Sequence, residues 1–173
     1  VITSQCALQN PTDQEPLQCH STWREDERDS PPEEINSAEI LLSPDSRFLY
    51  VSNRDVVVPC YNPIHNTEYG RKSRCSIAVF AVLDGGARVQ LIQHVSPMGR
   101  HPRALTFLNR GSHLAVANKD EGYQSTKEGG NLVLFPIAPN TGLLTFDQAV
   151  VSEDICGITL TQPTWIHPLS RPI

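Results

Sequence analysis

Four residues of this chain have side chains suited to binding and processing a small anion. Arg54 and Arg103 carry guanidinium groups, which bind a carboxylate or a phosphate through two parallel hydrogen bonds. Glu39 and His101 can transfer protons. We therefore predict that Arg54 and Arg103 bind substrate and that Glu39 and His101 are possible acid and base residues. The predicted site contains no metal and no cofactor.

Each of these residues also has a structural interpretation. Arg54 could form only a salt bridge between neighbouring units of the fold, with Glu39 as its partner. The run from His101 to Arg103 could be a kinked strand entry that ends in a solvated arginine. A charged segment, Lys119 to Glu121, is interpreted as a plain turn. The other histidines show no mutual spacing typical of a metal site (His20, His65, His94, His113 and His167).

The elements that position these residues follow from a pattern that occurs twice, about 65 residues apart, at 39–53 and 104–118. In each copy an apolar run enters a short polar turn and leaves through a second apolar run that ends in Asn, which indicates a tight β-hairpin. A further apolar run follows each copy, at 76–82 and 131–137. A fourth strand is expected to complete each unit.

Repeated units of four antiparallel strands are typical of β-propeller blades, which bury their faces by stacking on one another. We predict an all-β fold, a β-propeller fragment with about two complete four-stranded antiparallel blades and edge strands of two more. Residues 1–36 would form an edge strand (Val1–Leu8) and a long, solvated, partly disordered loop. Residues 37–95 and 96–151 would form the two blades, and 152–173 would begin a following blade. Blades missing from this chain are the expected partners of its open edges.

Propeller topology also predicts which loops meet. Turns between strands one and two, and between three and four, lie on one face of a blade. The loops between strands two and three and the connections between blades lie on the other, and here these are the long ones (9–36, 54–74, 97–103 and 119–130). Long loops on a rigid scaffold commonly carry binding and catalytic residues.

Composition excludes some classes of function. The net charge of −5 and the pI of about 5.6 argue against nucleic acid as a partner. No apolar run approaches the length of a membrane helix, so no membrane partner is expected. The five cysteines have no C-x-x-C spacing, which favours reduced thiols and a cytoplasmic location, with pairing of Cys60 and Cys75 as the alternative.

Specific segments of the chain resemble the lactonase family of seven-bladed propellers, which includes bacterial 6-phosphogluconolactonase and fungal 3-carboxy-cis,cis-muconate cyclase. The resemblance covers about residues 37–168 and is most specific in the string Ser43-Pro-Asp-Ser-Arg-Phe-Leu-Tyr-Val-Ser-Asn-Arg54. It extends to Gly99-Arg-His-Pro-Arg-Ala104, Val116-Ala-Asn118 and residues 133–143. The long first loop is closer to the cyclase branch.

The resemblance implies an enzyme that forms or opens a lactone on a small carboxylated or phosphorylated substrate. It places Arg54 where the cyclase branch has a substrate-binding arginine. The family's other site residues, a His, a second Arg and a Glu, would come from earlier blades, so the isolated chain is expected to be inactive. Ser46 departs from the family's usual turn Gly.

A function of another class is also consistent with the sequence. A non-catalytic propeller could present the same loop face to a protein partner, because fold does not determine function. Aromatic residues that would anchor such a partner occur in the long loops (Trp23, Tyr61, Tyr69 and Tyr123).

Overall fold

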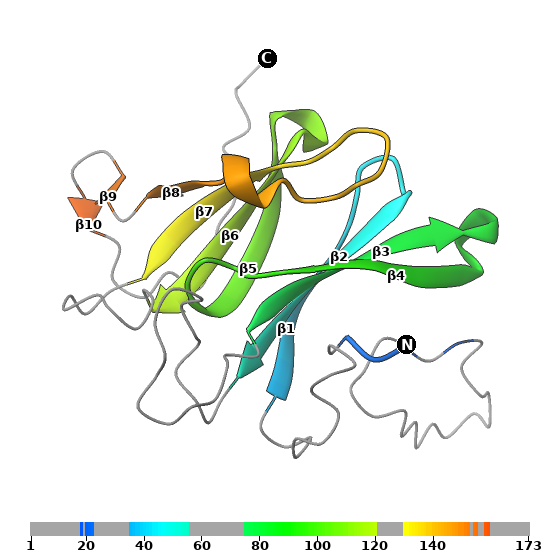
Figure 1. Cartoon of the computed structure of the whole chain (residues 1–173), viewed down its shortest axis with the longest axis horizontal. Coiled ribbons are helices and arrows are strands. Elements are labelled where there is room, and N and C mark those ends of the chain that lie inside the picture. Colours follow the sequence, from blue (N-terminus) through cyan, green and yellow to red (C-terminus); the bar gives the residue numbers. More distant parts are fainter. Residues whose placement is uncertain are drawn as a thin grey trace, which may run out of the picture.

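The computed structural model describes residues 18, 20–22, 35–55, 75–120, 130–152, 154–155 and 158–159. Within these residues the chain contains β-strands and short 3-10 helices and no α-helix. Two four-stranded antiparallel sheets lie side by side (Figure 1). The predicted all-β propeller fragment is confirmed.

The first sheet has the order β1-β2-β3-β4. Its strands are β1 (Ile35–Leu42), β2 (Phe48–Asp55), β3 (Ser76–Leu83) and β4 (Arg88–Val95). A short helix, η3 (Asp84–Gly86), forms the turn between β3 and β4. We call this sheet the first blade.

The second sheet repeats this order as β5-β6-β7-β8. Its strands are β5 (Arg100–Leu108), β6 (His113–Asp120), β7 (Asn131–Pro136) and β8 (Val150–Ser152), with η4 (Asn109–Gly111) between β5 and β6 and η5 (Phe146–Gln148) before β8. We call this sheet the second blade. A small hairpin of β9 (Asp154–Ile155) and β10 (Ile158–Thr159) follows it. The predicted edge strand at Val1–Leu8 and the predicted third copy of the repeat at 162–168 lie outside the described residues.

The turn between β1 and β2 is closed by a serine side chain. Ser46 has a positive φ of 59°, a conformation in which Gly meets no steric penalty. Ser43 Oγ accepts hydrogen bonds from the backbone N–H groups of Arg47 and Phe48, at 3.1 and 2.9 Å. These bonds satisfy two backbone donors of the turn.

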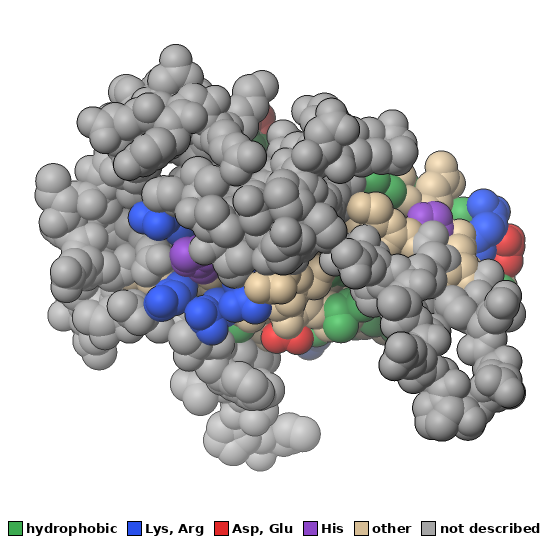
Figure 2. Space-filling view, turned by 90° about the horizontal axis from the view of Figure 1, so that it is seen from below, with side chains coloured by type: hydrophobic (Ala, Val, Ile, Leu, Met, Phe, Trp, Pro, Cys, Tyr) green, Lys and Arg blue, Asp and Glu red, His purple; other side chains and the backbone are tan. Residues whose placement is uncertain are grey.

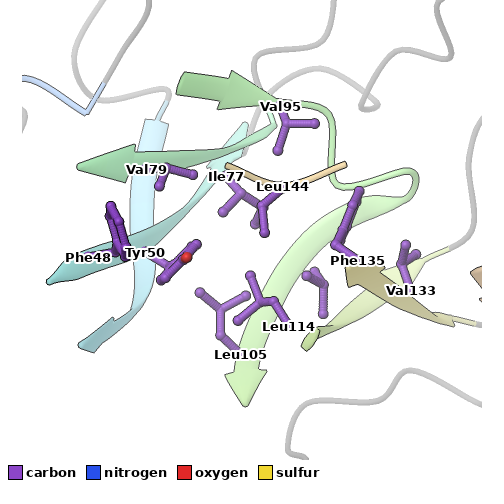
Figure 3. Close-up of a cluster of buried hydrophobic side chains, with 11 residues drawn as sticks. Phe48, Tyr50, Ile77, Val79, Val95, Leu105, Leu114, Val133, Phe135 and Leu144 are labelled. Atoms are coloured by element: carbon purple, nitrogen blue, oxygen red, sulfur yellow. The ribbon is translucent and has the colours of Figure 1, made fainter. Parts of the chain in front are cut away.

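The two blades share one apolar core, drawn in Figure 3. Tyr50 from the first blade meets Phe107 from the second edge to face, with ring centroids 5.5 Å apart. The Tyr50 hydroxyl donates a hydrogen bond of 2.8 Å to the carbonyl of Gly142. Other buried members from the first blade are Phe48, Ile77, Val79 and Val95, and those from the second are Leu105, Leu114, Val116, Val133, Phe135 and Leu144. Successive side chains of a strand point to opposite faces of the sheet, so one whole face of each sheet is buried in this interface.

The opposite face of the first blade carries the same apolar pattern as the face by which the second blade packs. Val51, Ala78 and Phe80 are buried there, and they correspond in the repeat to Val116, Val133 and Phe135 of the shared core. The inner-strand members of this face are exposed. Ile40 is 54% and Leu42 is 48% exposed. By the repeat, this is the face on which a preceding blade packs.

Gln18 and residues 20–22 lie against the outer part of this face, contrary to the prediction that the whole of 9–36 is a solvated loop. Gln18 Nε2 donates a hydrogen bond of 3.2 Å to the carbonyl of Val89, and Gln18 Oε1 accepts one of 2.9 Å from the Val89 N–H. In the second blade, Gln93 Nε2 donates to the carbonyl of Leu144 at 3.0 Å, and Gln93 Oε1 accepts from the Leu144 N–H at 2.9 Å. Gln18 and Thr22 therefore occupy the positions toward the first blade that Gln93 and Pro97 occupy toward the second.

A buried asparagine holds this incoming segment in each blade. Asn53 Nδ2 donates to the carbonyl of Thr22 at 2.9 Å, and Asn118 Nδ2 donates to the carbonyl of Pro97 at 2.8 Å. Asn118 also donates to Asn131 Oδ1 at 2.8 Å, and Asn131 Nδ2 donates to the carbonyl of Met98 at 2.9 Å. The asparagine that ends the repeated motif thus ties each blade to the chain that enters it.

The two asparagines differ in what their side-chain oxygens accept. Asn53 Oδ1 accepts from the hydroxyls of Thr22 and Ser37, at 2.7 and 3.1 Å. At the equivalent positions of the second blade the chain has Pro97 and Pro102, which have no side-chain donor. Asn118 Oδ1 is buried without a hydrogen-bond partner for this reason.

Cys75, which precedes β3 and is 6% exposed, is disulfide-bonded. The other four cysteines lie outside the described residues. The expectation of reduced thiols is therefore wrong for Cys75. The predicted cytoplasmic location rested on that expectation and stays a prediction.

Asn118→Ala should lower the free energy of unfolding by about 2 to 3 kcal/mol, because it leaves the buried Pro97 carbonyl and Asn131 side chain without their donors. Thermal or urea unfolding measures this change. Asn140→Ala, at an exposed position, is the matched control and should change stability by less than about 0.5 kcal/mol. Equal effects of the two substitutions would contradict the role given to Asn118.

The isolated 173-residue chain should self-associate, because Ile40 and Leu42 expose apolar surface on an unpaired blade face. Sedimentation velocity over a range of concentrations measures this association. Replacing both residues with Lys should reduce it. A chain that stays monomeric at all concentrations and melts in one sharp transition would contradict the prediction.

Candidate functional site

Of the predicted site residues, Arg54 lies at the end of β2 and His101 and Arg103 lie near the start of β5, whereas Glu39 is in the middle of β1. Antiparallel pairing places the start of β1 beside the end of β2, with Asn36 opposite Arg54. It places the start of β5 beside the end of β6, with Arg100 opposite Asp120. Seen from this edge, Lys and Arg side chains gather around a histidine over the second blade (Figure 2).

Local irregularities in β5 set the direction of its side chains at this edge. The pairing of β5 with β6 shifts between Pro102 and Ala104, so Arg103 is the extra residue of a β-bulge. Bulges turn a side chain away from the regular alternation and often occur beside functional sites. His101 has a positive φ of 52°, which is uncommon for any residue other than Gly. The predicted kink at the strand entry is thus present.

Arg54 and Arg103 come close enough to interact electrostatically. Burial lowers the pKa of Arg54, and the positive charge of Arg103 lowers it further. The Nε atoms of both arginines are buried without a hydrogen-bond partner. Two like charges with unsatisfied donors are unfavourable together, and an anion between them would relieve both costs.

The structure does not favour the purely structural interpretations of Arg54, Arg103 and Lys119. Among the described residues no ion pair joins Arg54 to a carboxylate, and Glu39 is held through its backbone N–H, which donates to Ser52 Oγ at 3.0 Å. The buried Nε of Arg103 differs from the solvated arginine of the alternative interpretation. The interpretation of Lys119 and Asp120 as a turn is wrong, because pairing with β5 continues β6 to Asp120.

One arginine at this edge was not among the predicted site residues. Arg100 is the first residue of β5, and its Nε is also buried without a partner. The signal was present in the sequence, since Arg100 and Arg103 flank the same His-Pro pair. Side-chain burial, which distinguishes Arg100 from an ordinary surface arginine, is not visible in a sequence.

A cavity of about 320 Å³ lies at the opposite edge, between the hairpin turns of the two blades. Two of its charged lining residues, Arg47 and Asp45, are paired with each other, and the third, Arg110, is exposed to solvent. Arg47 Nε bonds Asp45 at 2.8 Å, and Arg47 Nη2 donates to the carbonyl of Pro139 at 2.7 Å. Hydrogen bonds from Ser43 and Arg47 lower the pKa of Asp45 to about 2. The arginine edge, where charged donors lack acceptors, is therefore the stronger candidate site.

The described residues contain no cluster of three or more His, Cys, Asp or Glu side chains that could hold a metal ion. No helix in the described part of the chain has the length and apolar character needed to span a membrane.

Comparison with known proteins relates this chain to sugar lactonases. It is 31% identical over 108 residues to a 6-phosphogluconolactonase of Formosa agariphila, a match that covers 62% of this chain and 24% of the relative. A Bacteroides uniformis structure, provisionally assigned as a 6-phosphogluconolactonase, matches with a TM-score of 0.50 and 25% identity over 75% of this chain and 28% of that one.

The periplasmic gluconolactonase of Pseudomonas aeruginosa has a similar fold, with a TM-score of 0.55 at 19% identity over 80% of this chain and 29% of that one. This chain thus spans about a quarter of the length of these relatives. The family model described as "Lactonase, 7-bladed beta-propeller" matches residues 5–157. The chain belongs to the lactonase family of seven-bladed β-propellers.

Proposed function

We propose that the propeller containing this chain opens or forms a lactone on a small anionic substrate, and that Arg54 and Arg103 bind an anionic group of that substrate. The observation that carries this proposal is the pair of neighbouring guanidinium groups with buried, unpartnered Nε atoms. A carboxylate or a phosphate supplies the acceptors and the negative charge that this pair lacks.

Binding at this edge would orient the lactone for reaction. In hydrolysis, water adds to the carbonyl carbon, the carbonyl oxygen becomes an oxyanion, and the ring C–O bond then breaks. A base removes a proton from the attacking water, and an acid supplies a proton to the departing ring oxygen. Fixed positive charge near the carbonyl stabilises the oxyanion, and closure of a hydroxy acid to its lactone, with release of water, follows the same path in reverse. On carboxymuconate, a carboxylate oxygen would instead add to one carbon of a carbon–carbon double bond while an acid supplies a proton to the other carbon, and no water is released.

Residues of this chain fill part of that scheme. Arg54 and Arg103 come from neighbouring blades, so the anion would lie across their interface. Glu39 and His101 remain the candidates for proton transfer. His101 lies between Arg100 and Arg103 in β5, whereas Glu39 lies in β1 of the other blade. Further site residues would come from blades outside this chain, and we expect activity only in the complete propeller.

Arg54→Ala in the complete propeller should lower kcat/KM by about ten- to a hundredfold, because a charge-assisted hydrogen bond from Arg contributes about 1.5 to 3 kcal/mol. Arg54→Lys should recover only part of the loss, because an ammonium group cannot make the planar two-point contact. Activity would be measured on lactones of phosphorylated sugar acids and on carboxymuconate.

Arg88→Ala is the control for this experiment, since Arg88 forms an exposed ion pair with Asp84 at the opposite edge of the first blade. Thermal melts of all variants separate loss of activity from loss of folding. Normal kcat/KM in a well-folded Arg54→Ala variant would reject the role of Arg54. Absence of lactone turnover in the complete wild-type propeller would reject the reaction and favour a binding module.

A further inference from the structure

We propose that the cavity between the hairpin turns of the two blades binds a small aromatic monocarboxylate, and that Arg110 binds the carboxylate. The residues that line this cavity come from the edge opposite Arg54 and Arg103. It is therefore a site separate from that of the proposed lactone reaction, and it would take a ligand of another chemical class.

The walls of the cavity come from turns that contact each other across the two blades. Its volume of about 320 Å³ lies at the lower end of the range for small-molecule sites, about 300 to 1,000 Å³. A Cβ added to Gly111 of η4 would meet Pro44 Cγ at 3.2 Å, so these two turns are in contact. A Cβ added to Gly142 would overlap the ring of Phe48, so the turn after β7 lies directly on that ring. Both blades thus shape the cavity through contacts that need no ligand.

The buried part of the cavity lining is apolar. Phe48 and Tyr50 project from the same face of β2 (Figure 3), and Ile137 adds an aliphatic side chain. The Tyr50 hydroxyl hydrogen is already used in the 2.8 Å bond to the Gly142 carbonyl. An aromatic ligand ring can pack on these rings in the offset or edge-to-face arrangements that aromatic pairs prefer. A sugar acid would lose its hydrogen bonds with water there, so the lining disfavours it.

The charges that line the cavity leave one positive charge without a partner. The lining contains one acid and two arginines, Asp45, Arg47 and Arg110. Asp45 pairs with Arg47 at 2.8 Å and accepts a hydrogen bond of 2.6 Å from the Ser43 hydroxyl. Arg110 forms no ion pair with any described residue. One carboxylate on the ligand would therefore balance the charge of the lining.

The other charged residues near the hairpin turns do not line the cavity. Asp84 and Arg88 pair with each other at 2.9 Å, at the turn between β3 and β4. Asp147 is exposed on η5 and is not among the lining residues. Arg110 is therefore the charged group of the cavity that is available to a ligand.

The repeat explains why Arg110 lacks an acid in its own turn. Arg110 and Ser112 stand where the first blade has Asp45 and Arg47, so a residue pair that neutralises itself is replaced by two donors. Ser112 Oγ lies 2.9 Å from Nδ1 of His113. When that Nδ1 carries the hydrogen, the Ser112 hydroxyl is free to donate to the same carboxylate as Arg110. The η4 turn thus offers a charged and a neutral donor two residues apart.

NMR titration of the complete propeller with three matched ligands tests this inference. Phenylacetate has the ring and the carboxylate, 2-phenylethanol has the ring without the charge, and acetate has the carboxylate without the ring. We expect wild type to bind phenylacetate at least about tenfold more tightly than either of the others. Arg110→Ala should reduce phenylacetate affinity to within about twofold of that for 2-phenylethanol, and should leave 2-phenylethanol affinity unchanged.

Arg88→Ala is the matched control, because Arg88 is an exposed arginine of another hairpin turn and does not line the cavity. Arg54→Ala should also leave phenylacetate affinity unchanged, because Arg54 lies at the other edge. The proposal is overturned if wild type does not prefer phenylacetate, if Arg110→Ala keeps the preference, or if Arg54→Ala removes it. Thermal melts check that each variant is folded, and none of these outcomes depends on lactone turnover.

Discussion

Burial of one sheet face against the next is the interaction on which the rest of this structure depends. A four-stranded sheet has two apolar faces and cannot cover either by itself. The face of the first blade that includes Tyr50 and Ile77 is covered by Leu105 and Leu114 of the second, whereas Ile40 and Leu42 on its other face stay exposed. The candidate site lies at the edge of that interface, so its geometry exists only when the blades are stacked.

Hydrogen bonds from buried asparagines fix the position of the segment that precedes each blade. Apolar packing is non-directional and tolerates small shifts, but an amide that donates to a particular carbonyl does not. Asn53 holds Thr22 and Asn118 holds Pro97, each at the edge that carries the arginines. Basic residues directly follow both asparagines, so the residue that fixes the chain also fixes the start of the charged edge.

The two blades share this asparagine but differ in the surroundings of its side-chain oxygen. In the first blade, hydroxyls of Thr22 and Ser37 satisfy the Asn53 oxygen. In the second, prolines stand at both equivalent positions, and the chain between them contains two residues with positive φ, Met98 and His101. A repeated scaffold has thus been altered in one copy, at the segment that presents the arginines. Backbone strain of this kind is typical of functional sites.

The sequence by itself determined the class of fold and its repeat. Alternating apolar residues and turn-forming residues are local features, and they predicted both hairpins and the four strands of each blade. They also identified Arg54 and Arg103, because each stands beside a recognisable strand boundary. Local patterns could not reveal that Gln18 and Thr22 bind the first blade, since these polar residues are far in sequence from Val89 and Asn53.

Only the tertiary structure decided which arginines carry unsatisfied donors and which are neutralised. The sequence shows Asp45 two residues before Arg47, but only the structure shows that these two side chains pair, and that Arg103 lies near Arg54 of the neighbouring blade. Arg100 is distinguished by the burial of its Nε atom. Burial and proximity across an interface depend on residues far apart in the chain, and for that physical reason they appear only after the blades have stacked.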